Sequence, residues 1–390
     1  MSVNGNRRSV YFGIIWWAWR LLGAVELNAR SLGSYRFWRA VALNAIVTAA
    51  FPVMLILTTL SFELPLDNLM NFNISLTSVA TSVKFLIYVR QLRKIPEIER
   101  LLAKLDTRVS TNDQRVHHAQ TSRMLSIIST LYKLSYGATG INSNVAVFFR
   151  EQRSLPFPAW FPLDWTNSLT NYFIALMHQF LAISMQILQN FVDDLFPPLV
   201  FILIAGHCDQ LVLRLSAIGY DQSDRRSNEQ ELIKCIRDHQ IICRLHLLAM
   251  EVISWPLLVQ FIVISIDVGA ALCALLFYVE SMQERLYYAS FIFALAMQIF
   301  PVCYYGTLVE YSFGRLHFAA YSSNWVDQSI TYRKNLIIFV ERTQRLPKQR
   351  AGNFIPIALT TFLANCKAAY SFCTLLADNG TDKEELSRQL

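Results

Sequence analysis

The chain has 390 residues, of which 54% are hydrophobic and 16% charged, and its mean hydropathy is +0.32. These values exclude an ordinary soluble domain, and several stretches of about 20 residues with few charges have the length that a helix needs to cross a bilayer. The net charge of +7 could suit a nucleic-acid partner in a soluble protein, but in a membrane protein the positive-inside rule explains it better. Because glycine is sparse and strand-like alternation is absent, we expect an all-α polytopic membrane protein rather than a β-barrel.

The first expected element is a helix that lies on the membrane surface. Residues Val10–Leu22 contain Trp16, Trp17 and Trp19, and tryptophan at this density prefers the membrane–water interface. No small-residue cleavage site follows an apolar core in this region. We therefore expect no removable signal peptide.

Seven apolar stretches are long enough to be membrane-spanning helices. In chain order, the predicted spans are Trp38–Leu60, Leu69–Val89, Met124–Phe149, Ser168 to beyond Phe191, Ser254–Val279, Tyr287–Val309 and Phe354–Ala377. An odd number of spans places the two termini on opposite sides of the membrane.

The distribution of lysine and arginine predicts which terminus is cytoplasmic. The N-terminal tail and the connections over Arg93–Arg123, His207–Met250 and Tyr311–Asn353 carry 25 of these residues, whereas the connections after spans one, three and five and the C-terminal tail carry 5. Basic residues gather in cytoplasmic loops, so we expect a cytoplasmic N-terminus and an extracellular C-terminus. This orientation is the inverse of that in G-protein-coupled receptors.

The fourth apolar stretch is too long to be only a span. Ser168–Ala205 as a continuous helix would measure about 57 Å. Asp193 and Asp194 are expected to mark the inner membrane boundary, and Pro197-Pro198 is expected to bend or break the helix. The apolar residues that follow need other helices to cover them, so we expect a cytosolic helical region for assembly.

Other cytosolic connections also carry helical patterns. Leu92–Leu105 has an amphipathic pattern with Pro96 in a first helical turn. The polar segment Asp221–Glu229 predicts a loop. Glu231–Met250 predicts a helix that runs into the fifth span.

The C-terminal third contains a series of motifs. A polar, basic helical stretch with a tryptophan is followed by a short basic loop and then by the last apolar span. In order, the motifs are Tyr321-x-x-x-Trp325, Tyr332-Arg333-Lys334, Arg342-x-Gln344, Gly352-x-Phe354-x-Pro356, Phe362 and Ala369-Tyr370-Ser371-Phe372. This block resembles the C-terminal signature of insect odorant receptors, and upstream the resemblance lies in the inverted topology and the long fourth helix.

The resemblance implies a function. Members of that family are odorant-gated, non-selective cation channels rather than enzymes, and four subunits surround one pore. A ligand-specific, or tuning, member assembles as a heteromer with the shared odorant receptor coreceptor. Its ligand is a small volatile organic odorant, and its location is the plasma membrane of olfactory sensory neurons, in cilia or dendrites.

The resemblance also divides the chain into regions. Residues 1–37 would be a cytoplasmic tail, 38–309 spans one to six with the odorant pocket, 311–353 a cytosolic anchor where subunits meet, 354–377 a pore-lining segment and 378–390 an extracellular tail. The seventh helix of the family is split, and its first half would be about Asn324–Arg345.

Departures from related motifs favour a tuning odorant receptor. Gustatory receptors and the coreceptor end with a motif of the type Thr-Tyr-hydrophobic-Gln-Phe, whereas here Ala369 precedes Tyr370. Leu376 and Ala377 stand where Gln and a bulky apolar residue would be. The gate positions of the family fall on Cys373 and Ala377, which are both small, so this subunit is expected to narrow the pore less than its partners do.

Helical periodicity gives a second interpretation of the last span. Five small or polar residues repeat at intervals of four and three and therefore share one face: Thr360, Ala364, Lys367, Ser371 and Thr374. In a bilayer such a face meets water or another helix rather than lipid. Lys367 thus joins the candidate pore residues, where its charge would oppose cation flow; alternatively it pairs with a carboxylate of a neighbouring subunit or extends to the interface.

Three more charged residues lie inside predicted spans. Lys84 and Lys133 lie toward the cytoplasmic halves of spans two and three, so we expect both to extend to the interface. Asp267 near the middle of the fifth span is expected to bond to a neighbouring helix rather than to a ligand.

The resemblance implies an odorant site among the outward halves of spans two, three, four and six. These halves offer aromatic, small and hydroxyl-bearing residues, the mixture that is typical of apolar pockets. The candidate ligand-binding residues are Ile74, Thr77, Ser78, Tyr136, Gly137, Gly140, Ile141, Asn144, Tyr172, Phe173, Met177, Tyr287, Tyr288 and Phe291. The alternative for each is packing within the helix bundle.

Metal and cofactor chemistry is not expected. His178 has no second ligand at a suitable spacing, and the seven cysteines show no metal-binding pattern and no paired framework. Asn73 and Asn379 begin glycosylation sequons. Two further classes stay open, a gustatory-type receptor channel and, more distantly, a G-protein-coupled receptor, whereas a transporter is disfavoured because no inverted repeat with paired broken helices is present.

Overall fold

The computed structural model describes residues 11–61, 65–145, 147, 153–220, 224–279, 282–371 and 374, and these residues are almost entirely helical. The N-terminal part contains α1 (Gly13–Leu21), α2 (Ala24–Ala29), α3 (Tyr35–Asn44), the π-helix η1 (Ala45–Ala50), α4 (Phe51–Thr59), α5 (Pro65–Gln91), the 3-10 turn η2 (Leu92–Lys94), α6 (Ile95–Asp106) and α7 (Asn112–Val145). The C-terminal part contains α8 (Leu169–Ala217), α9 (Arg225–Cys273), the π-helix η4 (Ala274–Tyr278), α10 (Met282–Gly314), α11 (Leu316–Tyr321) and α12 (Ile330–Thr343). A hairpin of β1 (Arg350–Ala351) and β2 (Ile355–Pro356) then leads into a helix over residues 359–371.

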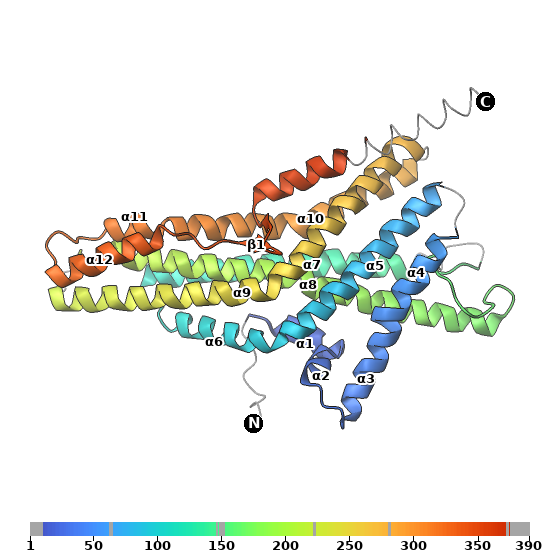
Figure 1. The fold of residues 1–390 in the computed structure, drawn as a ribbon, viewed down its shortest axis with the longest axis horizontal. Helices are drawn as coiled ribbons and strands as arrows, with labels where there is room; N and C mark the ends of the chain where they lie inside the picture. Colours follow the sequence, from blue (N-terminus) through green and yellow to red (C-terminus); the bar gives the residue numbers. More distant parts are fainter. Residues whose placement is uncertain are drawn as a thin grey trace.

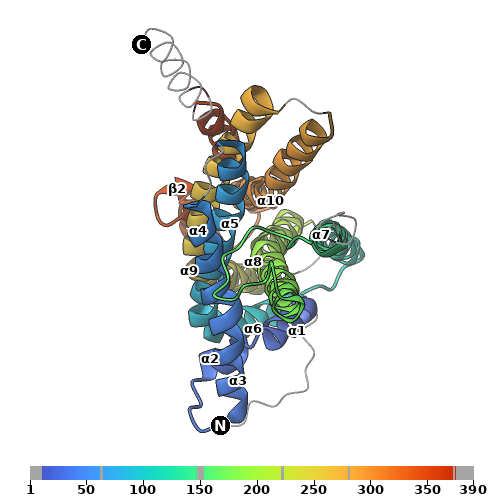
Figure 2. The same ribbon diagram turned by 90° about the vertical axis from the view of Figure 1, so that its right-hand side faces the viewer.

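The helices gather at one end of the molecule and spread at the other (Figure 1). The two longest, α8 and α9, have 49 residues each. At the gathered end they lie beside α10, α11 and α12, whereas at the other end α4, α5, α9 and α10 diverge from α7 and α8 (Figure 1). The view turned by 90° shows α7 against α8, and α4, α5 and α9 in a separate column (Figure 2).

The helix α8 is the centre of the packing. Its residues 191–208 are buried on every side, and a helix that is apolar all round must be covered by others. It contacts α1, α5, α7, α9, α10 and α11. The prediction that the apolar stretch after Pro197-Pro198 packs on other helices is confirmed. Of the predicted bend or break, a break is wrong: α8 continues through both prolines because packing on all sides outweighs the backbone hydrogen bonds that they remove. A bend stays a prediction.

The structure also corrects one predicted loop. The helix α9 runs unbroken into the predicted fifth span, as expected, but it begins at Arg225, inside the predicted loop Asp221–Glu229. Residues 221–223 lie outside the described residues. Asn228 donates to Gln328 Oε1 at 3.3 Å, and Glu229 accepts from Ser329 Oγ at 2.7 Å. The polar residues here therefore have tertiary partners, so their polarity did not indicate a loop.

The predicted helix Leu92–Leu105 is confirmed as η2 and α6, with Pro96 in the first turn of α6. The last predicted span, in contrast, begins later than expected. Its first residues belong to the hairpin and a turn, and the helix begins at residue 359. Gly352 turns the chain with a φ of +57°, and its N–H donates to the carbonyl of Ser254 at 2.9 Å. This contact fastens the hairpin to α9.

Five described stretches are long and apolar enough to cross a membrane, judged by length and composition. They are Tyr35–Thr59, Asn71–Asp106, Leu169–Ala217, Arg225–Leu276 and Tyr288–Tyr321. They overlap the predicted spans one, two, four, five and six. The predicted third span lies on α7, and the described part of the predicted seventh span lies on residues 359–371.

The tryptophans of α1 differ sharply in their environment. Trp19 is fully buried, and its ring centroid lies 6.2 Å from that of Tyr88 and 5.8 Å from that of Phe196. Trp17 is 58% exposed. One face of α1 therefore packs into the protein core, and the location of its other face at a membrane surface stays a prediction.

Replacing Trp19 by alanine should destabilise the protein strongly. The Trp19→Ala change removes a large buried ring and leaves a cavity between α1, α5 and α8, which costs about 3–5 kcal/mol. We expect a lower melting temperature of the detergent-solubilised protein, measured by size-exclusion chromatography after heating. Trp17→Ala is the matched control, and equal melting temperatures for the two variants would contradict the packing of α1.

Candidate functional site

A buried polar network joins five helices near the centre of the molecule. The Lys84 ammonium on α5 lies 2.7 Å from Asp194 Oδ1 on α8 and also donates to Gln260 Oε1 on α9. Gln260 Nε2 donates to Gln298 Oε1 on α10 at 2.9 Å, and the Tyr136 hydroxyl on α7 donates to Asp194 Oδ2. The side chains of the ion pair are only 3% and 4% exposed.

The expectation that Lys84 extends to the membrane interface is therefore wrong. Asp194 is within ion-pair distance, and the two charges stay inside because each satisfies the other. Asp193 is also buried, so neither aspartate faces water within this chain. Lys133 is exposed, and its extension to the interface stays a prediction.

Sequence reasoning missed this network. The available signal was the presence of one lysine and one aspartate in separate long apolar helices. A lone buried charge is costly, so opposite charges in different spans are candidates for a pair. The sequence did not show how α5 and α8 are oriented about their own axes, and this orientation makes the two side chains face each other.

The candidate residues of α5 contact three other helices. Thr77 Oγ1 donates to Asp267 Oδ2 on α9 at 2.8 Å, so Asp267 bonds to a neighbouring helix as expected. Ser78 Oγ donates to Gln186 Oε1 on α8 at 2.8 Å. Ile74 packs against the small cluster that α4 and α8 form around Phe51.

Three of the candidate residues of α7 face α8. The rings of Tyr136 and Phe191 are 5.9 Å apart, and Asn144 Nδ2 is 3.5 Å from Ser184 Oγ. A methyl group added at Gly140 would meet a side-chain atom of Ile187 at 3.8 Å, an ordinary contact distance. Gly140 therefore lies directly against α8 with space for a small group.

Two other candidates on α7 point elsewhere. Gly137 and Ile141 are exposed, and nothing lies within 4 Å of a methyl group built at Gly137. On α8, Phe173 and Met177 are also exposed, whereas Tyr172 is half-buried and its hydroxyl donates to the carbonyl of Ser154 at 3.3 Å. The exposed four face away from the interior of this chain, toward lipid or a neighbouring subunit.

The candidates of α10 pack against the end of α9. Tyr288 is buried with Ala271 and Ala274, and Phe291 packs on the same cluster. The side chain of Tyr287 lies outside the described part of the structure. The fourteen candidates thus fall into separate environments on α5, α7, α8 and α10, and the tightest group is Tyr136, Gly140 and Asn144 with their α8 contacts.

The helix over residues 359–371 is attached to α9 and α10. The Leu359 N–H donates to Thr307 Oγ1 at 2.9 Å, and Asn365 Nδ2 donates to the carbonyl of Phe261 at 3.4 Å. The rings of Phe300 and Phe362 are 5.5 Å apart. These contacts hold one side of the helix against the chain.

The predicted polar face of this helix is not covered by the chain itself. Thr360, Ala364, Lys367, Ser371 and Thr374 are all exposed. An uncovered face of small and polar residues in a membrane helix is open to water or to another subunit. Cys373, Leu376 and Ala377, the other candidate pore residues, lie outside the described residues.

Sequence comparison places this architecture in a family. The sequence model described as 7tm Odorant receptor matches residues 64–370. Odorant receptor 23a of Drosophila melanogaster is 41% identical over 378 residues, which cover 97% of this chain and 98% of that protein. Odorant receptor 59a of the same species is 34% identical, covering 94% of this chain and 96% of that protein. This chain belongs to the insect odorant receptor family.

Solved structures agree with the fold of this odorant receptor. The insect olfactory receptor OR5 from Machilis hrabei in complex with eugenol has a TM-score of 0.79 at 16% identity, and the match covers 94% of this chain and 99% of that one. A second structure of the same receptor has a TM-score of 0.77 at 14% identity. The protein is therefore an all-α, multi-pass membrane receptor and not an enzyme, and the motif-based resemblance is confirmed.

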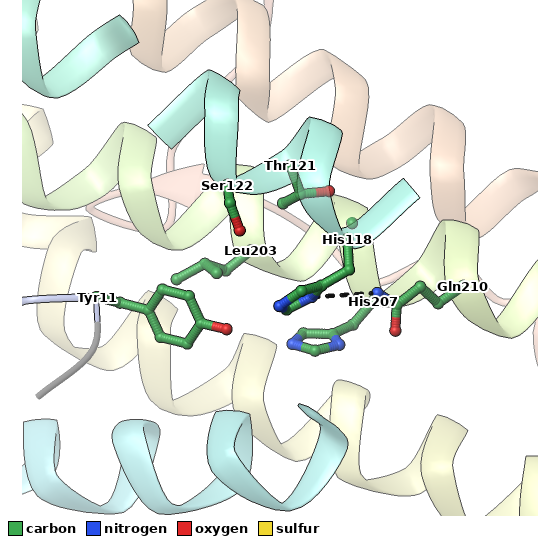
Figure 3. Close-up of a pocket in the computed structure, with 8 residues that line it drawn as sticks. Tyr11, His118, Thr121, Ser122, Leu203, His207 and Gln210 are labelled. Atoms are coloured by element: carbon green, nitrogen blue, oxygen red, sulfur yellow. Dashed lines mark hydrogen bonds between the residues drawn. The ribbon is translucent and has the colours of Figure 1, made fainter. Parts of the chain in front are cut away.

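At the gathered end of the receptor, the helices α6, α7 and α8 and the N-terminal segment meet at a small polar cluster. The Tyr11 hydroxyl donates to both carboxylate oxygens of Asp106, at 3.0 and 2.9 Å, and His207 Nε2 lies 3.6 Å from Asp106 Oδ1. Figure 3 shows Tyr11, His118 and His207 around a cavity of about 10 Å³, which has room for one water molecule. Burial and the nearby carboxylate raise the pKa of the Tyr11 phenol. Within the described residues, no three potential ligands lie close enough together to hold a metal ion.

A groove of about 470 Å³ lies between α9 and α12 at the same end of the receptor. Its apolar lining includes Leu247 and Ile338, which are 56% and 67% exposed. Arg244 and Arg342 add two positive charges. Exposed apolar side chains at this density, rimmed by polar groups, are typical of a protein contact surface.

Removing one charge of the Lys84–Asp194 pair should damage the receptor more than removing both. Lys84→Met leaves a buried carboxylate without its partner, which costs about 3–5 kcal/mol, whereas Lys84→Met/Asp194→Asn removes both charges and retains an oxygen for Tyr136. We expect a lower melting temperature and less surface protein for the single variant, and partial recovery of both for the double variant. Lys133→Met is the control. A single variant as stable as the wild type would show that the pair is dispensable.

Proposed function

We propose that this receptor is the odorant-binding subunit of a ligand-gated, non-selective cation channel, which it forms as a heteromer with the odorant receptor coreceptor. The observation that carries this proposal is the match of the family over residues 64–370, which includes the helix whose polar face is uncovered in the single chain. A face of this kind needs water or another subunit beside it. A central pore formed by several subunits supplies both.

The proposed orientation follows from charge. With 25 basic residues in one set of connections and 5 in the other, the end of the molecule where α8 to α12 gather is cytoplasmic. The spread end, with α4, α5 and the start of α8, lies toward the outside of an olfactory sensory neuron. A subunit with this orientation exposes its ligand site to the extracellular side and its groove between α9 and α12 to the cytoplasm.

We place the odorant between α5, α7, α8 and α10, with the contact of α7 and α8 around Gly140 as its centre. The related receptor from Machilis hrabei was solved with eugenol, a small aromatic molecule. The apolar and aromatic side chains near Tyr136 and Asn144 suit a ligand of that size, with selectivity set by shape more than by charge. The odorant would open the pore only by binding the open state more tightly than the closed state.

Filling the space at Gly140 should reduce odorant sensitivity. Gly140→Ile places a branched side chain against Ile187 and takes volume from the proposed site, so we expect the half-maximal odorant concentration to rise about tenfold or more. Ala138→Ile is the control, because Ala138 is exposed on the other side of α7. Equal concentration–response curves for both variants, at equal surface density, would place the odorant elsewhere.

The groove between α9 and α12 is the proposed contact with another subunit. Ile338→Arg adds a third positive charge at its exposed apolar rim, so we expect co-purification with the coreceptor to fall roughly tenfold or more while the melting temperature stays unchanged. Val116→Arg, at an exposed apolar position on α7, is the control. Unchanged co-purification of the Ile338 variant would exclude this groove as the interface.

Whole-cell recording tests the function itself. Cells expressing the receptor with and without an insect coreceptor would be exposed to a broad odorant panel. We expect rapid inward cation current only with the coreceptor, and the current should persist when G-protein signalling is blocked. A response that requires G-protein signalling would favour the G-protein-coupled alternative and overturn the proposal.

A further inference from the structure

The buried network of Lys84 and Asp194 connects the proposed odorant site with the pore helix. On one side, Tyr136 donates its hydroxyl proton to Asp194 Oδ2, and its ring faces Phe191 at 5.9 Å. Tyr136 lies one helical turn from Gly140 on α7. Any movement of α7 relative to α8 therefore acts directly on the Asp194 carboxylate.

On its other side, the network ends beside the contacts that hold residues 359–371. Gln260 precedes Phe261, whose carbonyl accepts from Asn365 Nδ2 at 3.4 Å. Gln298 lies two residues before Phe300, whose ring packs on Phe362 at 5.5 Å. The two glutamines therefore occupy the segments of α9 and α10 that carry the last helix.

The burial of the ion pair makes the connection between α7 and the last helix rigid. Lys84 and Asp194 are almost completely shielded from water, so separating them would leave two uncompensated charges in an apolar interior. The pair has few intermediate arrangements: it moves as a unit or it breaks. Interactions of this kind have discrete states, which is what transmission between two sites requires.

A second, shorter contact runs in parallel. Tyr132 stacks on Tyr136 with centroids 6.2 Å apart, and its hydroxyl lies 3.5 Å from the carbonyl of Gln298. The helix α7 thus contacts α10 directly as well as through the ion pair. Both routes converge on Gln298.

We propose that the Lys84–Asp194 network, with Tyr136, Gln260 and Gln298, transmits odorant binding to the pore helix and sets the balance between closed and open channel. This inference rests on the proposed function. Four of the side chains, Lys84, Asp194, Gln260 and Gln298, are positioning residues: they act through α9 and α10 and need not touch the odorant or the permeating ions. Tyr136 also belongs to the proposed odorant site and joins that site to the network. A purely structural network would affect the amount of folded receptor but not its gating.

A double-mutant cycle on the odorant response separates these roles. Tyr136→Phe removes one hydroxyl from the network while keeping the ring, and Asn365→Ala removes the contact of the last helix with α9. Each would be made alone and together, and expressed with the coreceptor. Half-maximal odorant concentration and odorant-independent current would be measured at matched surface density.

We expect the combined effect on half-maximal concentration to differ from the product of the single effects by about fivefold or more, the size of a typical coupling between sites. The control cycle pairs Thr139→Val with Asn365→Ala, because the Thr139 hydroxyl donates only within α7, to the carbonyl of Ser135 at 3.0 Å. In that control cycle, the effect of the double variant on half-maximal concentration should equal the product of the two single effects. Gln260→Met, which leaves the ion pair in place, should also change the odorant-independent current.

The outcomes distinguish a failure of the network to transmit odorant binding from a failure of the proposed function. The inference would be overturned, and the proposed function left intact, by three results together. The wild-type receptor would give an odorant-evoked current, the effects of the Tyr136 and Asn365 variants on half-maximal concentration would simply multiply, and the Gln260 variant would have an unaltered odorant-independent current. No wild-type current with the coreceptor at any odorant would overturn the proposed function and this inference with it. Coupling in the Tyr136–Asn365 cycle, without coupling in the Thr139–Asn365 control cycle, would support the network as the connection between the odorant site and the last helix.

Discussion

The complete burial of one segment of α8 constrains the rest of this receptor. Residues 191–208 have no face open to solvent, so every neighbouring helix must present an apolar side to them. The helices α1, α5, α7, α9, α10 and α11 all pack against α8, although they come from distant parts of the chain. The bundle at the gathered end is the cover that this segment requires, and even two consecutive prolines do not interrupt it.

The same burial explains the specific pairing of the polar groups in the network of Lys84 and Asp194. Lys84, Asp194 and Gln260 lie where four or more helices converge, and water cannot replace a lost partner there. At the spread end, in contrast, the apolar side chains of Phe173, Met177 and Ile141 are exposed. The receptor therefore has a tightly packed end that suits assembly and a looser end that suits a change of shape when a ligand binds.

Some of the candidate site could be predicted from residues alone. Gly140 and Asn144 were predicted as ligand-binding residues of the third span, with packing in the helix bundle as the alternative, and in the structure they lie against α8. Asp267 was expected to bond to a neighbouring helix, and Thr77 is that partner. Tyr136 and Gly140 face inward, whereas Gly137 and Ile141 do not. Composition could not separate these pairs, because the sequence of a helix without strong amphipathicity does not indicate which side faces the interior.

The sequence by itself determined the membrane class, the order of the apolar segments and, through the motifs between Tyr321 and Phe372, the family. These properties depend on local composition and on the spacing of residues along the chain, both of which are known without the three-dimensional structure. Tertiary structure alone decided that Lys84 pairs with Asp194, that α8 passes through its prolines and that the last helix begins only at residue 359 after a hairpin. Each of these depends on which surfaces meet in space. A buried charge, a helix without its full set of hydrogen bonds and a turn at Gly352 are stable only when distant residues supply the missing contacts.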